Sequence, residues 1–197
     1  MTVASVDTRT QILAAARAAL ERGGYHGIGL ADVAAASGFS RQAIYRHFGS
    51  KAGLLLAVVQ YADDVEGLPG LREAITNAPT ALEALAAFVE MVATLTPRIY
   101  ATAVVLDAAR RTDPDVAAAW SERMESRRRT CRRIVRRLAD EGVLRPDLPV
   151  RDATDLLWSI SSIHIYEALV ITSGWSKPRF RRELHALAAR ALMTEAN

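Results

Sequence analysis

Five side chains in the first quarter of the sequence carry hydrogen-bonding groups of the kinds that hold and read nucleic acids. They are two arginines, a glutamine, a tyrosine and a histidine, all within the segment RQAIYRHF from Arg41 to Phe48. If this segment is a helix, Ala43, Ile44 and Phe48 can point inward while the five polar side chains crowd the remaining surface. Two helical turns with so few apolar residues bury too little area to exist for packing alone. A binding role is therefore indicated.

The residues just before this segment predict a second short helix and a tight turn. Leu30, Val33 and Ala34 have the i, i+3, i+4 spacing of an apolar helix face. Gly38 can adopt the positive φ that ends this helix, and Ser40 can cap the next one. Two short helices around such a turn form a helix-turn-helix, whose second helix enters the major groove of DNA.

The order and spacing of ten residues resemble the DNA-binding domain of the TetR family of transcriptional repressors. They are Tyr25, Val33, Ala34, Gly38, Ser40, Tyr45, His47, Phe48, Ser50 and Lys51. The match covers roughly residues 8–64, and a weaker match to the family's variable ligand domain continues to the C-terminus. Two positions depart from the family pattern: Gly29 replaces the usual Ser or Thr, and Gly53 replaces an acidic residue. Each glycine weakens a helix N-terminus by about 0.5–1 kcal/mol without removing a group that would touch DNA.

The helix-turn-helix is expected over about residues 29–48, with Arg41 and Gln42 at the start of its second helix. At that place side chains reach base edges, where Arg binds guanine and Gln binds adenine through paired hydrogen bonds. The alternative is that both side chains belong to a solvated helix face. Ser40 has two compatible roles, as a helix cap and as a phosphate contact.

The resemblance implies contacts with the DNA backbone for Tyr45, His47 and Lys51. A phenol, an imidazole and an ammonium group can each donate a hydrogen bond to a phosphate oxygen. For His47 the alternative is a packed side chain that fills the domain. Arg46 either meets a phosphate or faces solvent.

The distribution of charge agrees with a nucleic-acid partner. The chain has 25 Lys and Arg, 22 Asp and Glu, and a net charge of +3. Residues 1–55 hold six of the basic and three of the acidic residues, so the rest of the chain is balanced. The positive excess therefore lies in the segment with the helix-turn-helix, as a phosphate-binding surface requires.

The composition favours an all-α fold with a substantial core. Half of the 197 residues are hydrophobic, only 6% are aromatic, and no segment alternates in the manner of a strand. We expect about nine helices in two domains. Residues 7–66 form a three-helix helix-turn-helix DNA-binding domain, and residues 67–197 form a helical ligand-binding and dimerisation domain.

Capping residues and prolines predict where the helices begin. After a loose arm of residues 1–6, the starts with capping side chains are Thr8 (with Gln11), Ser50, Thr80 (with Glu83) and Ser176. The starts with proline are Thr96–Pro97, Asp113–Pro114 for a long helix closed by Gly142, and Asp147–Pro149 for a helix reaching Gly174. Residues 71–77 form at most a short helix.

The helix expected over residues 147–174 is apolar most of the way round, so it needs cover on more than one side. A symmetric dimer supplies this cover if this helix and the last one pack against their copies, and the resemblance implies the same. The expected interface residues are Trp158, Ile163, Tyr166, Val170, Phe180, Leu184, Leu187 and Leu192. The alternative is a helix buried wholly within its own protomer.

Large aromatic residues and methionines on separate helices of the second domain could line an adaptable apolar pocket. The resemblance implies an effector cavity between such helices. The candidates are Phe88, Met91, Tyr100, Trp120, Met124, Trp158 and His164, the last as a polar group. The alternative for each is core packing, and for His164 a hydrogen bond within the core.

Seven arginines crowd the segment from Arg127 to Arg137. Apolar residues at helical spacing in the same segment provide a buried face, so the arginines are interpreted as its exposed remainder, partly matched by nearby acidic residues. Two alternatives stay open: direct DNA contact, and an arginine that reaches inward to an anionic ligand.

Other classes of function lack their signs in this sequence. There is no H-x-x-x-H pair, no partner for Cys131 and no glycine-rich phosphate loop, so we expect no enzyme, metal site or cofactor. The single cysteine excludes an internal disulfide and suits a reducing compartment. No apolar run of membrane-spanning length and no secretion signal are apparent, so a cytoplasmic protein without a membrane partner is expected.

The sequence thus predicts a homodimeric regulator that binds a palindromic operator in double-stranded DNA. We expect a repressor that a small hydrophobic or aromatic effector releases by shifting the population of DNA-competent dimers. The helix that begins at Lys51 is the expected lever. One alternative is a helix-turn-helix regulator without a small ligand. Another is a helical carrier or enzyme with a vestigial DNA-binding head.

Overall fold

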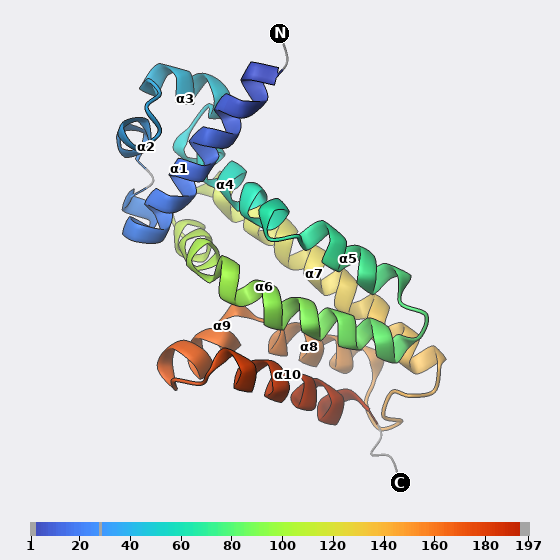
Figure 1. The fold of residues 1–197 in the computed structure, drawn as a ribbon. Coiled ribbons are helices and arrows are strands. Elements are labelled where there is room, and N and C mark those ends of the chain that lie inside the picture. Colours follow the sequence, from blue (N-terminus) through green and yellow to red (C-terminus); the bar gives the residue numbers. More distant parts are fainter. Residues whose placement is uncertain (1–2, 28, 194–197) are drawn as a thin grey trace. The chain divides into compact units, whose positions relative to one another are not determined.

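Helices joined by short turns make up almost all of the chain (Figure 1). The computed structural model describes the backbone of residues 3–27 and 29–193 and the side chains of residues 8–23 and 29–193. Its helices are α1 (Val3–Gly27), α2 (Leu30–Ser37), α3 (Arg41–Phe48), α4 (Lys51–Val65), α5 (Leu68–Asn77), α6 (Ala81–Ala109), α7 (Pro114–Asp140), α8 (Val150–Ile160), α9 (Ile163–Tyr166), the π-helical segment η1 (Glu167–Thr172) and α10 (Lys177–Leu192). Within the described residues there is no strand, only an isolated bridge between Leu144 and Met193. The expected all-α fold is confirmed.

The residues group into two compact units. The first unit comprises residues 1–66 and 99–122, and the second comprises residues 67–98 and 123–197. Helices α6 and α7 therefore have residues in both units, whereas α4 belongs wholly to the first. The predicted functional boundary at residue 66 stays a prediction. Residues 99–122 belong to the same compact unit as the N-terminal helices.

The core of the first unit is made by the apolar faces of α1 and α4, which lie beside each other (Figure 1). Val33 of α2 and Ile44 of α3 are fully buried against this core and fix the two short helices to it. The ends of α6 and α7 contribute Val105, Leu106 and Val116 to the same cluster. The helix-turn-helix is thus supported by packing that its own few apolar residues could not supply.

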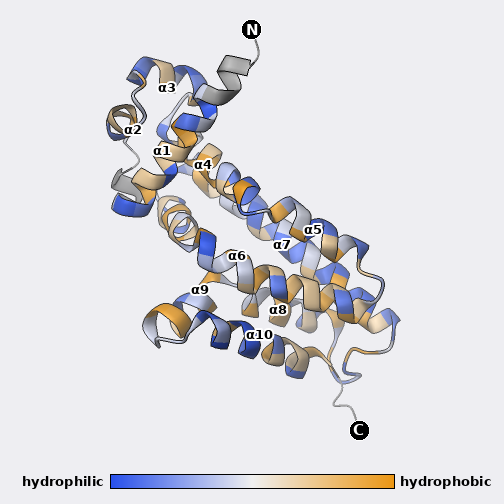
Figure 2. Ribbon diagram, in the orientation of Figure 1, coloured by the Kyte–Doolittle hydropathy of each residue, from blue (hydrophilic) through white to orange (hydrophobic). Residues whose placement is uncertain are grey.

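The second unit is built on the apolar faces of α6, α7, α8 and α10. Figure 2 shows α6 mostly in orange and pale tones, and Phe88 of this helix is 1% exposed. Ile134 of α7 and Leu157 of α8 are fully buried, and Phe180 of α10 is 1% exposed. The residue after α7 also contacts the start of α6: the Glu141 carboxylate accepts from the Ala81 N–H at 2.8 and 3.0 Å.

Most predicted helix starts are confirmed by capping hydrogen bonds. Ser50 Oγ accepts from the Gly53 N–H at 2.9 Å, and Ser176 Oγ accepts from the Arg179 N–H at 3.3 Å. At the start of α6, the Thr80 N–H donates to the Glu83 carboxylate at 3.0 Å, and Thr80 Oγ accepts from the Glu83 N–H at 3.2 Å, which completes a capping box.

The predicted start at Thr8 is wrong, because α1 already begins at Val3 and runs through Thr8. No proline or glycine lies among residues 3–7, so nothing in the backbone stops the helix from extending toward the N-terminus. Residues 3–6 of the predicted loose arm are therefore helical. Tyr25, one of the residues that carry the resemblance, has a side chain outside the described residues.

The predicted helix start at Thr96–Pro97 is also wrong, because α6 runs unbroken through Pro97. Proline removes one backbone hydrogen bond from a helix interior. The apolar face nevertheless continues on both sides of it, with Val92, Leu95, Ile99 and Ala103 all buried. Burial of this face outweighs the local cost of the proline.

The single helix predicted from Pro149 to Gly174 is instead broken into α8, α9 and η1. Ser161 Oγ donates to the Trp158 carbonyl at 2.9 Å and Ser162 Oγ accepts from the His164 N–H at 3.2 Å, so one serine helps to end α8 and the next caps α9. Serine side chains compete with the helix for backbone groups in this way. With the break, the structure has ten α-helices in its described part where about nine were expected.

Helix α6 also corrects the expectation that no apolar run could span a bilayer. It is the one described helix long and apolar enough by composition, and 56% of its most apolar 18-residue window is buried inside the chain. A core helix passes the same test, and the burial of Phe88 and its neighbours identifies α6 as one.

Candidate functional site

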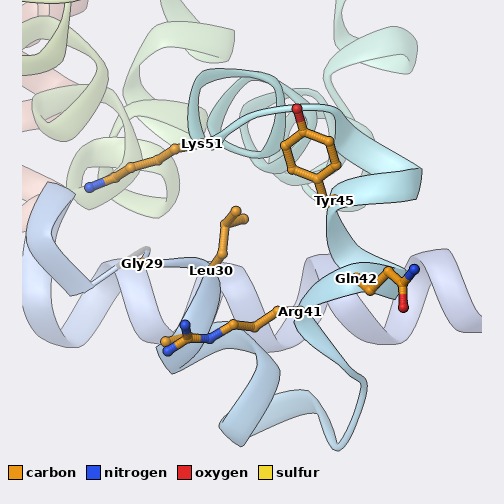
Figure 3. Close-up of a pocket in the computed structure, with 7 residues that line it drawn as sticks. Gly29, Leu30, Arg41, Gln42, Tyr45 and Lys51 are labelled. Carbon is orange, nitrogen blue, oxygen red and sulfur yellow. The ribbon is translucent and has the colours of Figure 1, made fainter.

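A hollow on the first unit brings together residues from α2, α3 and the start of α4 (Figure 3). Its lining comprises Gly29, Leu30, Ala31, Arg41, Gln42, Tyr45 and Lys51. In Figure 3, Arg41 and Lys51 extend past opposite sides of Leu30, while Gln42 lies at the other end of the view. Four of the seven predicted DNA-binding residues therefore share one concave surface.

Helix α3 is held so that its polar residues face outward. Gly38, with φ of 75°, ends α2, and Ser40 Oγ caps α3 by accepting from the Ala43 N–H at 3.1 Å. Ile44 is fully buried, which fixes the rotation of the helix. Arg41 and Gln42 are exposed at its first turn, where side chains of a recognition helix meet base edges.

The other predicted backbone contacts differ in exposure. Tyr45 is 62% exposed, a large value for an aromatic side chain, and Arg46 is also exposed. His47 is half-buried next to Phe48, with ring centroids 6.0 Å apart, so it has partly the packed role that was the alternative for it. An exposed phenol and guanidinium on one short helix are groups that can donate to phosphate oxygens.

Arg9 also lies at this site, although it was not among the predicted DNA-binding residues. Its guanidinium carbon lies 4.9 Å from the centroid of the Phe48 ring, so α1 places a positive charge beside the end of α3. The only signal for Arg9 in the sequence is its contribution to the charge excess, because its position depends on how α1 packs.

A salt-bridge network braces α1 against the end of α4. Arg17 contacts Glu21 on its own helix at 2.9 Å and Glu66 at 2.7 Å. Burial disfavours the charged guanidinium, but the hydrogen bonds to Glu66 and Glu21 outweigh it and raise the pKa of Arg17. The pairing fixes the helix that supports the helix-turn-helix.

The glycine expected to weaken α2 does leave that helix without a side-chain cap. Gly29 has extended φ and ψ of −61° and 139° and makes no side-chain hydrogen bond. Asp32 in the first turn is favourable for the helix dipole. Because Gly29 has no side chain, it contributes only backbone atoms to the lining of the hollow (Figure 3).

The predicted ligand-binding residues are not all brought together. Met124 and Trp158 meet, with Trp158 Nε1 donating to the Met124 carbonyl at 3.4 Å. Phe88 lines a separate packing gap between helices that is too narrow to hold a water molecule. Tyr100 and Trp120 belong to the first unit, and Met91 is half-buried on α6.

The prediction for His164 needs correction. Its side chain is 60% exposed and lies 3.5 Å from Glu167, so it is a surface residue of α9 and not a polar group inside a pocket. The break at Ser161 and Ser162 turns the chain before His164 and carries it to the surface.

The predicted dimer interface also needs correction. Tyr166, Phe180, Leu184 and Leu192 are at most 3% exposed within one protomer, so they cannot form a surface for a second copy. Tyr166 packs edge-on against Phe180, with ring centroids 5.2 Å apart. Trp158, Ile163 and Val170 are half-buried, and Leu187 is exposed. The exposed apolar residues of this region that were not predicted are Leu156 and Ile171.

The arginine run on α7 proves to be only partly an exposed face. Arg129 and Arg137 approach Glu125 and Glu141 at 4.0 and 3.6 Å, and these two pairs follow the predicted match with acidic residues. Arg137 also donates to the Ala78 and Pro79 carbonyls at 3.1 Å. Arg128 pairs with Asp155 of α8. Several of these side chains therefore join helices together.

No group of three or more His, Cys, Asp or Glu side chains in the described part of the chain has the arrangement of a metal site. Cys131 is fully buried, and burial raises the pKa of its thiol to about 12. A thiol with such a pKa is protonated and unreactive near neutral pH.

Comparison with known proteins gives matches to both parts of the chain. The model of a family described as bacterial regulatory proteins, tetR family, matches residues 12–58, which include the helix-turn-helix. The transcriptional repressor AcnR of Corynebacterium efficiens is 29% identical over 152 residues, covering 74% of this chain and 73% of AcnR. The transcriptional activator FasR of Mycolicibacterium smegmatis is 35% identical over 85 residues, covering 43% of this chain and 38% of FasR.

Among solved structures, a transcriptional regulator from Saccharomonospora viridis in complex with choline superposes with a TM-score of 0.80. The superposition covers 96% of this chain and 100% of that one at 22% sequence identity. This likeness shows that the same fold extends over both units.

Proposed function

Because the chain is a TetR-family transcriptional regulator, we propose that it binds a palindromic operator in double-stranded DNA as a homodimer and releases it when a small effector binds. The observation that carries the proposal is the first turn of α3. It presents Arg41 and Gln42 to solvent beside an exposed Tyr45, on a helix fixed by a buried Ile44. A rigidly held short helix with exposed, pairing side chains suits base recognition.

We assign base contacts to Arg41 and Gln42, and phosphate contacts to Ser40, Tyr45, Arg46, His47 and Lys51. Arg9 joins the second group because it extends the positive surface past Phe48. The predicted DNA-binding domain of residues 7–66 contains all of them. We also propose that the protein acts in the cytoplasm, where its DNA is.

A dimer is proposed because one short helix contacts too few base pairs for specific binding. Helices α8 and α10 lie side by side (Figure 1) and expose Leu156 and Leu187. These two leucines, with Ile163 and Ile171, replace the buried residues of the predicted interface. Isologous packing of the two helices against their copies would cover them.

Repression released by the effector is proposed over activation because the longer match is to a repressor. Residues 67–197 are the proposed effector and dimerisation domain. Helices α6 and α7 each contribute residues to both units, so they replace α4 as the proposed route by which the effector domain influences the head. The effector would favour the dimer conformation that binds DNA less well.

A second candidate, a regulator without a small ligand, is favoured by one observation. The packing gap beside Phe88 is too narrow to hold even a water molecule, whereas typical ligand sites measure roughly 300–1,000 Å³. Without an opening of the second unit, this gap could not hold a small ligand, as the second candidate expects.

Fluorescence anisotropy with ligand-stripped protein and duplexes selected from a random pool tests the proposal. We expect one preferred palindrome, two chains per duplex and affinity that falls steeply with salt. Arg133→Ala removes an exposed arginine of α7 and is the charge-matched control for Arg41→Ala, which removes a proposed base contact. Binding that shows no preferred sequence after selection would contradict the proposal.

A further inference from the structure

Arg127 of α7 points into the second unit with an unsatisfied donor. Its Nη1 donates to the Ser161 carbonyl at 2.8 Å, and its guanidinium carbon lies 5.0 Å from the centroid of the Trp158 ring. Its Nε is buried and has no hydrogen-bond partner. Buried donors are almost always paired in native proteins, so this nitrogen calls for an explanation.

The positive charge of Arg127 also lacks a counter-charge in the described part of the chain. None of the ion pairs formed there includes it, and the like charge of Arg123 acts on it unfavourably. The neighbouring Cys131 thiol is neutral, because burial raises its pKa to about 12. Burial is the main cause that lowers the pKa of Arg127; the Cys131 sulfur opposes this shift, and the like charge of Arg123 adds to it. A half-buried cation without an anion is unfavourable unless a binding partner supplies one.

The neighbouring Arg128 has a counter-charge, so the lack of one is specific to Arg127. Arg128 stacks on the same Trp158 ring, with its guanidinium carbon 5.6 Å from the centroid, but it is paired with Asp155. The indole ring therefore lies against two guanidinium groups, of which one is neutralised within the chain and the other is not.

Apolar surface lies next to the unpaired charge. Ser161, whose carbonyl holds Arg127, also lines the interior gap, together with Phe88, Val92, Leu157 and Leu184. The polar anchor and the apolar gap thus meet at one residue. That residue is also where α8 ends and the chain turns into α9.

We propose that Arg127 is the anchor of an effector with a carboxylate group on an apolar body, and that this monoanion is what opens the second unit. This inference rests on the proposed regulatory function. The Nε edge of the guanidinium would receive both carboxylate oxygens in the bidentate geometry that arginine favours. The apolar body would lie against Trp158 and enter the gap beside Phe88.

The same contact couples binding to movement. The Nε edge is buried, so Arg127 must rotate to offer it to a carboxylate; this rotation would withdraw Nη1 from the Ser161 carbonyl and free the end of α8 to shift. The packing gap beside Phe88, which is too narrow for a water molecule, can then open. A ligand that binds only the enlarged form shifts the population toward it.

The test uses the full-length protein and a fixed panel of probes: the straight-chain carboxylates from butanoate to decanoate, benzoate and phenylacetate, each with its neutral primary amide. Binding is measured by isothermal titration calorimetry and by the shift in Tm. We expect at least one carboxylate to bind and its amide to bind at least tenfold more weakly. Arg127→Met should abolish this preference, Arg127→Lys should retain part of it, and Arg133→Met, an exposed arginine of the same helix, should leave it unchanged.

Arg127→Met removes an uncompensated charge from a half-buried position, so the variant should fold with a Tm no lower than that of the parent chain. The proposal is overturned if no carboxylate in the panel binds, if the amides bind equally well, or if Arg127→Met binds like the parent chain. It is also overturned if Arg127→Met weakens the dimer in sedimentation at all ligand concentrations, because the counter-charge would then come from a second copy.

Operator binding separates this inference from the proposed function. A carboxylate that requires Arg127 but leaves operator affinity unchanged would support the site and contradict its regulatory role. A ligand that releases the operator equally well from the parent chain and from Arg127→Met would support the proposed regulatory function and overturn the inference.

Discussion

A Cβ atom placed on Gly53 would lie 2.1 Å from the carbonyl oxygen of Phe48. Gly53 is in the first turn of α4, two residues after Lys51, and Phe48 is the last residue of α3. The turn between the two helices is therefore so tight that it excludes any side chain at this position. Where the sequence alone suggested a weakened helix, the structure identifies a required glycine.

Gly53→Ala should destabilise the protein, by about 1–3 kcal/mol, although alanine is the better helix former. The backbone oxygen of Phe48 cannot move aside without disturbing the end of α3. Urea unfolding measures the change. Gly23→Ala is the matched control, because a Cβ there meets nothing within 4 Å. It should stabilise α1 by about 0.5–1 kcal/mol. Equal effects of the two substitutions would show that the contact with Phe48 has no influence.

Arg41→Ala and Lys51→Ala should weaken DNA binding in different ways. Loss of a bidentate contact to guanine costs about 1–3 kcal/mol and relaxes the sequence preference at one base pair. Loss of a phosphate contact weakens binding to all sequences alike and reduces the salt slope by about 1 per site. Anisotropy titrations on the selected palindrome, single-base variants of it and a scrambled duplex distinguish the two. A Lys51→Ala variant that altered base preference would contradict these roles.

Leu187→Asp should dissociate the proposed dimer. Leu187 is 37% exposed on α10, and a carboxylate in a packed interface would be buried without a partner. Sedimentation equilibrium should give the mass of one chain for this variant. Leu82→Asp on α6 is the control, because Leu82 is 43% exposed but lies away from α8 and α10 in the sequence. Dissociation by Leu82→Asp alone would move the interface to α6.

Acid should weaken the attachment of α10 to α6. Glu90 of α6 accepts from Arg181 Nε at 2.8 Å and lies 3.2 Å from His185 Nε2, both on α10. Burial raises the pKa of Glu90, but hydrogen bonds from Thr94, His185 and Arg181 outweigh it, and the net shift is downward from 4.5. Its contribution to stability is therefore complete above the unfolded pKa and is lost as the pH falls through the lower, folded pKa.

Thermal unfolding from pH 7 down to about pH 2 measures this loss, because a carboxylate with a lowered pKa becomes protonated below about pH 5. Glu90→Gln should lower Tm at pH 7 and reduce the dependence of Tm on pH. Glu73→Gln, an exposed residue of α5, should leave both unchanged. If Glu90→Gln kept the full pH dependence, the acid sensitivity would have to come from other carboxylates.

Cys131 should resist alkylation until the protein unfolds. The thiol is fully buried and its pKa is raised to about 12, so very little thiolate forms at pH 8. Modification by iodoacetamide, followed by mass spectrometry, should be slow in buffer and rapid in urea. Rapid modification of the native protein would show that the second unit opens around α7.

Much of the local structure could be read from short stretches of the sequence. The caps at Ser40, Ser50, Thr80 and Ser176 are confirmed, because a capping hydrogen bond joins residues only three positions apart. The exposed polar residues of α3 follow in the same way from its few apolar positions. Predictions were wrong where tertiary packing outweighed the local preference of a few residues. Pro97 reads as a helix start, yet burial of the apolar face on both sides carries α6 through it.

The sequence by itself therefore determined the all-α class, the helix-turn-helix, the residues that it exposes and the likeness to regulators of one family. Only the tertiary structure decided which apolar residues of α8 and α10 remain at the surface, because burial depends on which helices pack there. It also decided that one arginine in a run of seven turns inward without a counter-charge while its neighbour finds Asp155. Helical periodicity assigns Arg127 and Arg128 to a helix, but the side chains that surround each one come from a segment 27 to 34 residues away.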